Sequence, residues 1–132
     1  WSHGNVDFGA SRVRSGTVVV YVFEPDGRPR FAREISSRPD SLAVDPTGRV
    51  AVVGTGSCNE IVIETFDLSN AGLWRRLLPD GGPCFAAMVP GPASYGADHR
   101  LFVTGWIGAP VEIGGQALSP ADVDAVGVLL DP

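Results

Sequence analysis

The sequence predicts an all-β protein built from antiparallel sheets of short strands, and three observations support this. Two stretches, Val18–Ile35 and Ile61–Leu78, align with each other without a gap. The chain is rich in turn-forming residues, with 17 glycines and 11 prolines, as expected where many short strands need many turns. Its apolar runs, such as Val18–Phe23, have the length of a strand rather than of a helix.

Composition limits the classes of partner. At 132 residues the chain has the length of one domain, and 44% hydrophobic residues place it among folded globular proteins. A net charge of −5 with no basic cluster argues against nucleic acid or an anionic membrane as the main partner. No apolar run approaches the roughly 18–20 residues that a membrane-spanning helix needs, so we expect no membrane span.

Each of the two aligned stretches reads as a strand, a tight turn and a second strand. The aliphatic triplet Val18–Val20 matches Ile61–Ile63. Gly27 matches Asn70, and these are the two residue types that best tolerate a positive φ in a turn. We therefore expect two antiparallel hairpins with equivalent turns. Further matches are Phe31 with Trp74, Arg33 with Arg76, and Ile35 with Leu78.

Two more strands precede the second hairpin. Ser41–Asp45 and Arg49–Gly56 are strand-like and flank a turn with Asp at its first position, Pro at its second and Gly at its fourth, as type I turns prefer. Asp45 is accordingly predicted to serve this turn rather than catalysis. With the hairpin Ile61–Leu78, these strands make a four-stranded unit over residues 41–78.

A further unit begins at Cys84 and stops after three strands. The expected strands are Cys84–Pro90, Arg100–Trp106 and Ala125–Asp131, with Gly91–His99 as a lengthened turn between the first two. The second of these repeats the residue pattern of Arg49–Gly56. No fourth strand follows the third.

A short motif of apolar, acidic, apolar and glycine residues occurs twice, at Val6–Gly9 and Val111–Gly114. Each copy lies about a dozen residues before a third-strand segment, so each is predicted to form an additional small hairpin. The middle unit has only Gly56–Glu60 at this place. The sequence requires no helix, although Pro120–Val123 allows a helical turn.

Units of roughly 40–50 residues with four strands each are typical of the blades of a β-propeller. The sequence therefore predicts one β-propeller segment, with a partial blade at 1–35, a complete blade at 41–78 and a partial blade at 84–132. Because both end blades lack strands, we expect the chain to be a piece of a longer protein. Other chains, either copies of itself or the remainder of a longer precursor, should complete the end blades.

The segments AVDPTGRVAVVGTG, VDFG, VEIGG, VFEPDG and LWRR resemble bacterial β-propeller repeats of the SBBP and NHL type. Such repeats are typical of secreted or envelope proteins of myxobacteria and their relatives. The resemblance implies the propeller fold, a secreted or periplasmic location, and a role as a scaffold or binding module. It carries over no catalytic residue, because the shared motifs are turns, glycine bends and an aromatic residue on a strand.

Cys58 and Cys84 are the two cysteines of the chain. In a propeller, Cys58 would follow the second strand of one blade and Cys84 would open the first strand of the next, so both would lie on one face. The secreted setting implied by the resemblance favours a disulfide between them, and two buried free thiols are the alternative. A metal site made of two cysteines alone would be incomplete.

Trp106 is the candidate ligand-binding residue, because it ends a strand next to the expected small hairpin and aromatic rings supply flat apolar surface for a sugar. Trp74 stands at a repeat position in place of Phe31 and is predicted to be structural. We assign no cofactor, because no phosphate-binding glycine motif or nucleotide fingerprint is present.

Other polar residues are weaker candidates. His99 beside Asp98 could act as a general base, yet no serine or cysteine nucleophile has a recognisable motif, so a surface loop is favoured. The acidic residues near the C-terminus do not have the spacing of an EF-hand, and solvated turn positions are favoured over a calcium site. These acidic residues are Asp122, Asp124 and Asp131.

Two classes of function remain open at this point. The first is a non-catalytic secreted or envelope module that acts as a scaffold or binding surface. The second is part of a propeller enzyme, such as a secreted hydrolase, whose active site other blades complete. A carbohydrate-binding propeller is a further alternative.

Non-reducing peptide mapping by mass spectrometry tests the cysteine pairing. We expect a peptide containing Cys58 to be linked to one containing Cys84. Reduction should lower the free energy of unfolding by about 3–4 kcal/mol, because the disulfide closes a loop of about 27 residues in the unfolded chain. Two alkylated, unlinked cysteines in the untreated protein would contradict the prediction.

Overall fold

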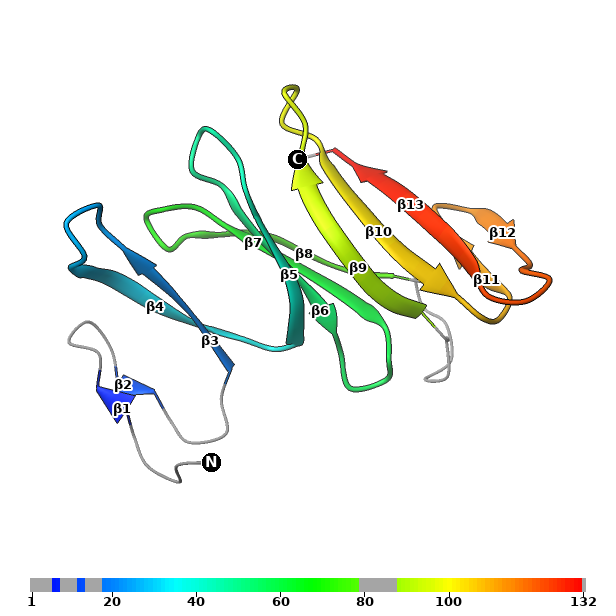
Figure 1. The fold of residues 1–132 in the computed structure, drawn as a ribbon, viewed down its shortest axis with the longest axis horizontal. Coiled ribbons are helices and arrows are strands. Elements are labelled where there is room, and N and C mark those ends of the chain that lie inside the picture. Colours follow the sequence, from blue (N-terminus) through cyan, green and yellow to red (C-terminus); the bar gives the residue numbers. More distant parts are fainter. Residues whose placement is uncertain (1–5, 8–11, 14–17, 79–87, 132) are drawn as a thin grey trace. The chain divides into compact units, whose positions relative to one another are not determined.

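The computed structural model describes residues 6–7, 12–13, 18–78 and 88–131. Every regular element in these ranges is a β-strand, which confirms the all-β fold class (Figure 1). The chain divides into two compact units, residues 1–36 and 37–132. No helix within the described ranges could cross a membrane.

The first unit contains two antiparallel hairpins. Strand β1 (Val6–Asp7) pairs with β2 (Arg12–Val13), which places a small hairpin at the predicted motif. Strand β3 (Val18–Phe23) pairs with β4 (Pro29–Ile35), as expected from the first aligned stretch.

The second unit begins with a four-stranded antiparallel sheet. Its strands are β5 (Arg38–Val44), β6 (Val50–Thr55), β7 (Ile61–Phe66) and β8 (Gly72–Leu78), and they lie side by side in sequence order. These are the four strands predicted for residues 41–78. Each strand passes to its neighbour through a tight turn, so the sheet is a simple meander.

A three-stranded sheet follows in the same unit, with the order β13–β10–β9. Its strands are β9 (Met88–Tyr95), β10 (Leu101–Ile107) and β13 (Asp124–Leu130). Between β10 and β13 the chain forms a small hairpin of β11 (Val111–Ile113) and β12 (Gln116–Leu118). The predicted third strand and the predicted extra hairpin are therefore present, whereas Pro120–Val123 forms bends and no helical turn.

The hairpins β3–β4 and β7–β8 have the same register at every paired position. Both ladders also shift by one residue at the same place, next to the turn. The ungapped alignment of the two stretches is thus correct in three dimensions. The corresponding pairs are Val18–Ile35 and Ile61–Leu78 at the open end, and Phe23–Pro29 and Phe66–Gly72 beside the turn.

Five hairpin turns share one geometry. In each, the backbone N–H of the first residue donates to the carbonyl of the fifth, and the N–H of the fourth donates to the carbonyl of the first. The fourth residue has a positive φ, which defines a type I turn followed by a G1 bulge. Gly27 and Asn70 therefore hold equivalent turn positions, as predicted. The fourth residues are Gly27 (83°), Gly48 (88°), Asn59 (61°), Asn70 (67°) and His99 (63°).

The lengthened turn predicted at Gly91–His99 is wrong. Strand β9 continues to Tyr95, and the turn to β10 is Gly96–Arg100, of the same size as the other four. Gly91 and the proline after it do not end the strand, because they fall where the β9–β10 ladder shifts register. β9 is an edge strand of its sheet, where a proline is tolerated. The predicted start of this strand, residues 84–87, lies outside the described residues.

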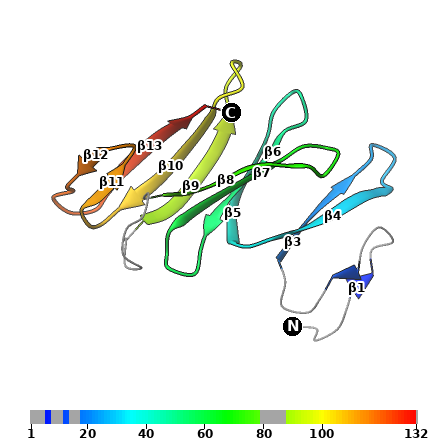
Figure 2. The ribbon, with the colours of Figure 1, turned by 180° about the vertical axis from the view of Figure 1, so that it is seen from behind.

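The two sheets of the second unit pack face to face (Figure 2). The backbone N–H of Ala93 in β9 also donates to Ser41 Oγ in β5, at 3.0 Å. The packed faces are aliphatic, so their burial supplies the main stabilisation of this unit. The core comprises Ala43, Ala51, Val53, Ile61, Ile63 and Leu78 from the four-stranded sheet, and Met88, Leu101, Val103, Ile107, Val111 and Leu130 from the strands that follow.

Gly105 in β10 allows the close approach of these sheets. A Cβ atom at this position would lie 2.9 Å from the carbonyl oxygen of Val89 and 3.2 Å from Cδ1 of Ile61 in the facing sheet. Real side chains do not tolerate such contacts without movement of their neighbours.

Gly105→Ala should lower the free energy of unfolding by about 1–3 kcal/mol, because the added methyl group overpacks the interface between the sheets. Urea denaturation measures the effect. Gly127→Ala is the matched control, since a Cβ there would meet only the ring of Phe102, which is exposed and can move. Equal destabilisation by the two substitutions would contradict this account of the interface.

Candidate functional site

Trp106, the predicted ligand-binding residue, lies on the outer face of the three-stranded sheet. Side chains of β10 alternate in direction, so Leu101, Val103 and Ile107 point into the core whereas Trp106 points away from it. Val89 of β9 and Ala125 of β13 lie directly opposite Trp106 on its two sides. The predicted site is thus part of a sheet surface and not an isolated platform.

Large apolar side chains gather on this outer face. Trp106 is 52% exposed, Val89 59%, and Phe102 and Leu129, which lie opposite each other, are 42% and 55% exposed. We call these four residues the outer apolar face. Contiguous exposed apolar surface on a sheet is typical of an interaction site.

The outer apolar face corresponds by register to a face that is covered in the preceding sheet. Tyr95 pairs with Leu101 as Val44 pairs with Val50, and both ladders shift at the same distance from the turn. In this correspondence Phe102 takes the place of Ala51. Ala51 is completely buried against the three-stranded sheet. Phe102 therefore occupies a position that, in the four-stranded sheet, is covered by the next sheet.

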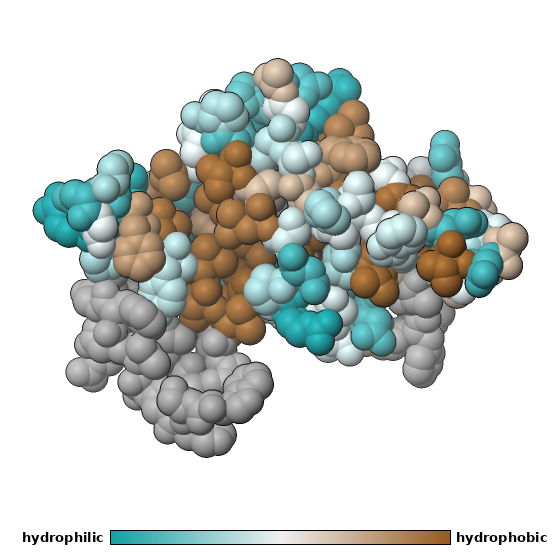
Figure 3. All heavy atoms as spheres, in the orientation of Figure 1, coloured by the Kyte–Doolittle hydropathy of each residue, from teal (hydrophilic) through white to brown (hydrophobic). Residues whose placement is uncertain are grey.

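A groove of about 350 Å³ lies beside β13. One wall is the β11–β12 hairpin and another is the end of β8. Figure 3 shows hydrophobic and hydrophilic residues interspersed over one face of the molecule. The described part of the chain supplies β13 with one partner strand, β10, so its other edge is unpaired there. The lining is aliphatic apart from Arg76, Gln116 and the glycines. Its apolar residues are Leu78, Ile113, Leu118, Val126, Val128, Leu129 and Leu130.

Asp45 holds the β5–β6 turn, as the sequence indicates. Its Oδ1 accepts hydrogen bonds from the backbone N–H of Thr47 (2.8 Å), the Thr47 hydroxyl (2.7 Å) and the backbone N–H of Arg49 (2.9 Å). Burial alone raises the pKa of Asp45, but these bonds and one to His99 outweigh it and lower the pKa to about 2. Asp45 is therefore an ionised structural group.

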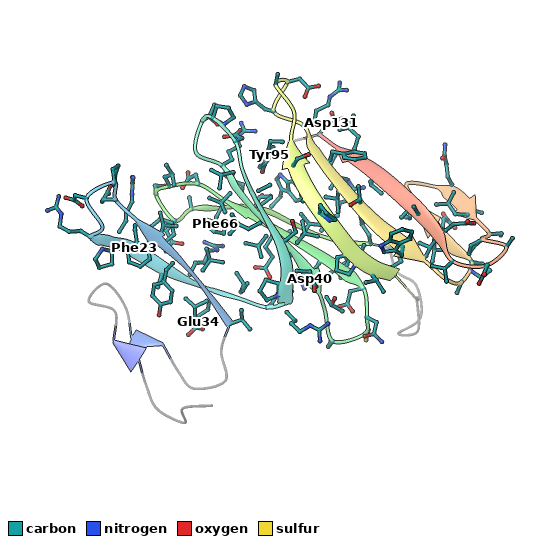
Figure 4. All side chains as sticks on the ribbon, in the orientation of Figure 1. Phe23, Glu34, Asp40, Phe66, Tyr95 and Asp131 are labelled. Atoms are coloured by element: carbon teal, nitrogen blue, oxygen red, sulfur yellow. The ribbon has the colours of Figure 1, made fainter. Side chains whose placement is uncertain are left out.

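His99 pairs with Asp45 rather than with its sequence neighbour Asp98. The distance from His99 Nδ1 to Asp45 Oδ2 is 3.1 Å, whereas Asp98 accepts a hydrogen bond from the backbone N–H of Arg100. The pair joins the turns at the same end of the two sheets. Tyr95, labelled in Figure 4, lies at the end of β9. Burial and the charge of Asp45 raise the pKa of its phenol.

Sequence reasoning missed this pair because its members are 54 positions apart. The available signal was that His99 occupies the turn position that Gly48 holds in the preceding sheet, where a residue with a large side chain is unusual. The pair has the form of a base and its orienting carboxylate. The described residues show no serine or cysteine hydrogen-bonded to His99. The contact with Asp45 links two turns.

The remaining predicted residues do not form a site in the described ranges. Cys58 lies in the β6–β7 turn, where its backbone N–H donates to Glu60 Oε2 at 2.7 Å. Cys84 lies outside the described residues, so its pairing with Cys58 stays a prediction. Asp131 forms an ion pair with Arg100, and the described residues include no group of three acidic, histidine or cysteine side chains suited to a metal ion. Trp74 packs against the core, in agreement with its predicted structural role.

No protein-family model, curated protein or solved structure matches the chain. Its class therefore rests on its own architecture. It is an all-β protein of antiparallel sheets, and its most developed surface features in the described ranges are an apolar sheet face and an unpaired strand edge.

Asp45→Asn should lower the free energy of unfolding at pH 7 by about 1–2 kcal/mol, because hydrogen bonds to a charged carboxylate are lost. The carboxyl has a lowered pKa when folded, so its contribution is present above the ordinary value of 3.8 and is lost as the pH falls towards 2. Urea denaturation between pH 7 and pH 2 should show that the difference in free energy of unfolding between wild type and Asp45→Asn becomes smaller as the pH falls from 3.8 towards 2. A difference that stays constant down to pH 2 would contradict the role of the ionised carboxylate.

The His99–Asp45 contact is separable from the turn itself. His99→Asn should keep the turn, since asparagine tolerates the positive φ, but remove the bond to Asp45. A double-mutant cycle of His99→Asn with Asp45→Asn should give a coupling energy of about 0.5 kcal/mol or more. Strict additivity would show that the contact contributes nothing to stability.

Proposed function

We propose that this chain is a non-catalytic β-propeller segment of a secreted or cell-envelope protein, acting as a scaffold or binding module. The described sheets contain two, four and three strands in sequence order, apart from the small hairpins, as a propeller interrupted in its end blades requires. The main support for the proposal is the outer apolar face, because the corresponding face of the four-stranded sheet is covered by the three-stranded sheet.

The partners that fit this face are other β-sheets. Four large apolar side chains exposed on one sheet would cost free energy in water, and an apolar sheet packed on them would remove that cost. A copy of this chain or the remainder of a longer precursor would supply such a sheet. The role proposed for the chain is therefore to assemble with further sheets into a larger β structure.

A second candidate function is carbohydrate binding at Trp106. The observation in its favour is the exposure of the indole on a flat surface, where a sugar ring can stack. Val89 and Ala125, which lie opposite Trp106 on its two sides, have apolar side chains that offer no hydrogen bonds to hydroxyl groups, so sheet packing is the stronger candidate. Glycan-array binding that disappears in Trp106→Ala would favour the carbohydrate function.

The assembly proposal predicts that the isolated chain self-associates through the outer apolar face. Light scattering and native mass spectrometry should show oligomers for the wild type and a shift to monomer for Trp106→Lys and Phe102→Lys. Leu73→Lys is the matched control, because Leu73 is 44% exposed but lies in β8 of the four-stranded sheet. Each variant is checked for wild-type circular dichroism.

Three results would overturn the proposal. A wild-type chain that stays monomeric at high concentration would show that the outer apolar face needs no cover. Robust hydrolase activity that is lost in His99→Ala would show that the chain is catalytic. Loss of oligomers in Leu73→Lys to the same extent as in Trp106→Lys would mean that added charge, and not this face, controls association.

A further inference from the structure

The unpaired edge of β13 is a second interaction feature, distinct from the outer apolar face. We infer that this edge binds an extended segment of another polypeptide as an added antiparallel strand, and that side chains of that strand fill the groove beside β13. The inference rests on the proposed function, since it specifies how an incomplete sheet is completed, and it names the chemistry of the strand that would do so.

The backbone supplies the first argument. β7 is paired on both sides, with β6 and with β8. β13 holds the corresponding place in the next sheet, because Leu101 pairs with Leu130 as Val50 pairs with Phe66. In the described chain, β13 has β10 on one side, and no strand lies on the other side in the place that β8 takes beside β7. A row of unpaired N–H and C=O groups on a seven-residue strand is a template for strand addition.

The groove supplies the second argument. It runs along five successive residues of β13, Val126–Leu130, so it follows the strand and is not a local hollow. Its far wall includes Arg76 and Leu78 at the end of β8, the fourth strand of the preceding sheet. The space therefore lies where a fourth strand of the three-stranded sheet would pack on the fourth strand of its neighbour.

The side chains of β13 indicate what the added strand carries. Val126 and Val128 point towards the core cluster and line the groove. In the four-stranded sheet the positions corresponding to them are Val62 and Glu64, which lie opposite Leu77 and Arg75 of β8. The Glu64–Arg75 pair places opposite charges across the ladder, which stabilises a sheet.

Val128 corresponds to Glu64, which lies opposite Arg75. The residue of the added strand opposite Val128 should therefore be apolar instead of basic. The residue opposite Val126 should be aliphatic, as Leu77 is opposite Val62. The predicted occupant is therefore an extended segment with apolar side chains at two alternate positions, aligned antiparallel to β13. Residues between them face the same side as Leu129 and are less restricted.

A labelled peptide tests the inference with the complete chain. The probe has the sequence of residues 71–78 with the change Arg75→Val, carries fluorescein, and is titrated with the protein while anisotropy is measured. We expect saturable binding, and binding up to about fivefold weaker for the peptide that keeps arginine, from the range of cross-strand pair energies. Absence of binding, or tighter binding of the arginine peptide, would overturn the predicted occupant.

Backbone pairing is tested by N-methylation. Two versions of the probe are methylated at alternate residues, so that one set blocks N–H groups directed at β13 and the other blocks those directed away from it. Only one version should lose binding, since successive N–H groups of a strand point to opposite sides. Equal loss or equal retention in both would exclude strand addition, even if the peptide binds.

Protein variants locate the site. Val128→Lys should weaken binding of the probe at least tenfold, because it places a charge in the groove, and Ile113→Lys on the hairpin wall should act in the same direction. Phe102→Glu is the control, since this side chain is exposed on the outer apolar face and does not line the groove. Loss of binding in Phe102→Glu alone would place the peptide on the outer apolar face and overturn the inference.

The experiments distinguish failure of this inference from failure of the proposed function. If oligomers depend on Trp106 but the probe does not bind, strand addition is wrong and the scaffold proposal stands. If the probe binds in the predicted way and the chain remains monomeric, the edge site stands and the assembly proposal is wrong.

Discussion

One turn geometry sets the register on which the rest of the structure depends. Each of the five type I turns fixes which residues of two strands face each other, and a slip of one residue would transfer every apolar side chain to the opposite face. The fourth turn residue must adopt a positive φ, which explains the glycines and asparagines at these points. Because the turns are alike, the ladders β3–β4 and β7–β8 have the same pairs. The ladders β5–β6 and β9–β10 share their register on both sides of the shift.

Common register gives each sheet of the second unit two non-equivalent faces. In the four-stranded sheet, Ala51 and Val53 meet the next sheet and are completely buried. In the three-stranded sheet the corresponding face carries the exposed Phe102 and Trp106. The contrast between a covered face and an exposed one, at the same register positions, is the observation on which the proposed assembly rests.

Much of the fold was predictable from the sequence, because turn chemistry and internal similarity are local signals. Gly27 and Asn70 identified equivalent turns, and the ungapped alignment gave the correct pairing. The turn assigned to Gly91–His99 was wrong because Gly91 was interpreted as a strand end, whereas it lies at a register shift inside β9. The Asp45–His99 pair was not predictable from local pattern, since it depends on how two hairpins pack. The four-residue outer face became visible once the register of β9, β10 and β13 was known.

The order in which strands pair has a consequence for folding kinetics. In the four-stranded sheet every ladder joins strands that are consecutive in the chain, so each can close through a short loop at small entropic cost. The pairing of β10 with β13 must instead close over the whole β11–β12 hairpin, between Ile107 and Asp124. Contacts of larger sequence separation form more slowly. The meander β5–β8 is therefore suited to form early and to present an apolar face on which β9, β10 and finally β13 assemble.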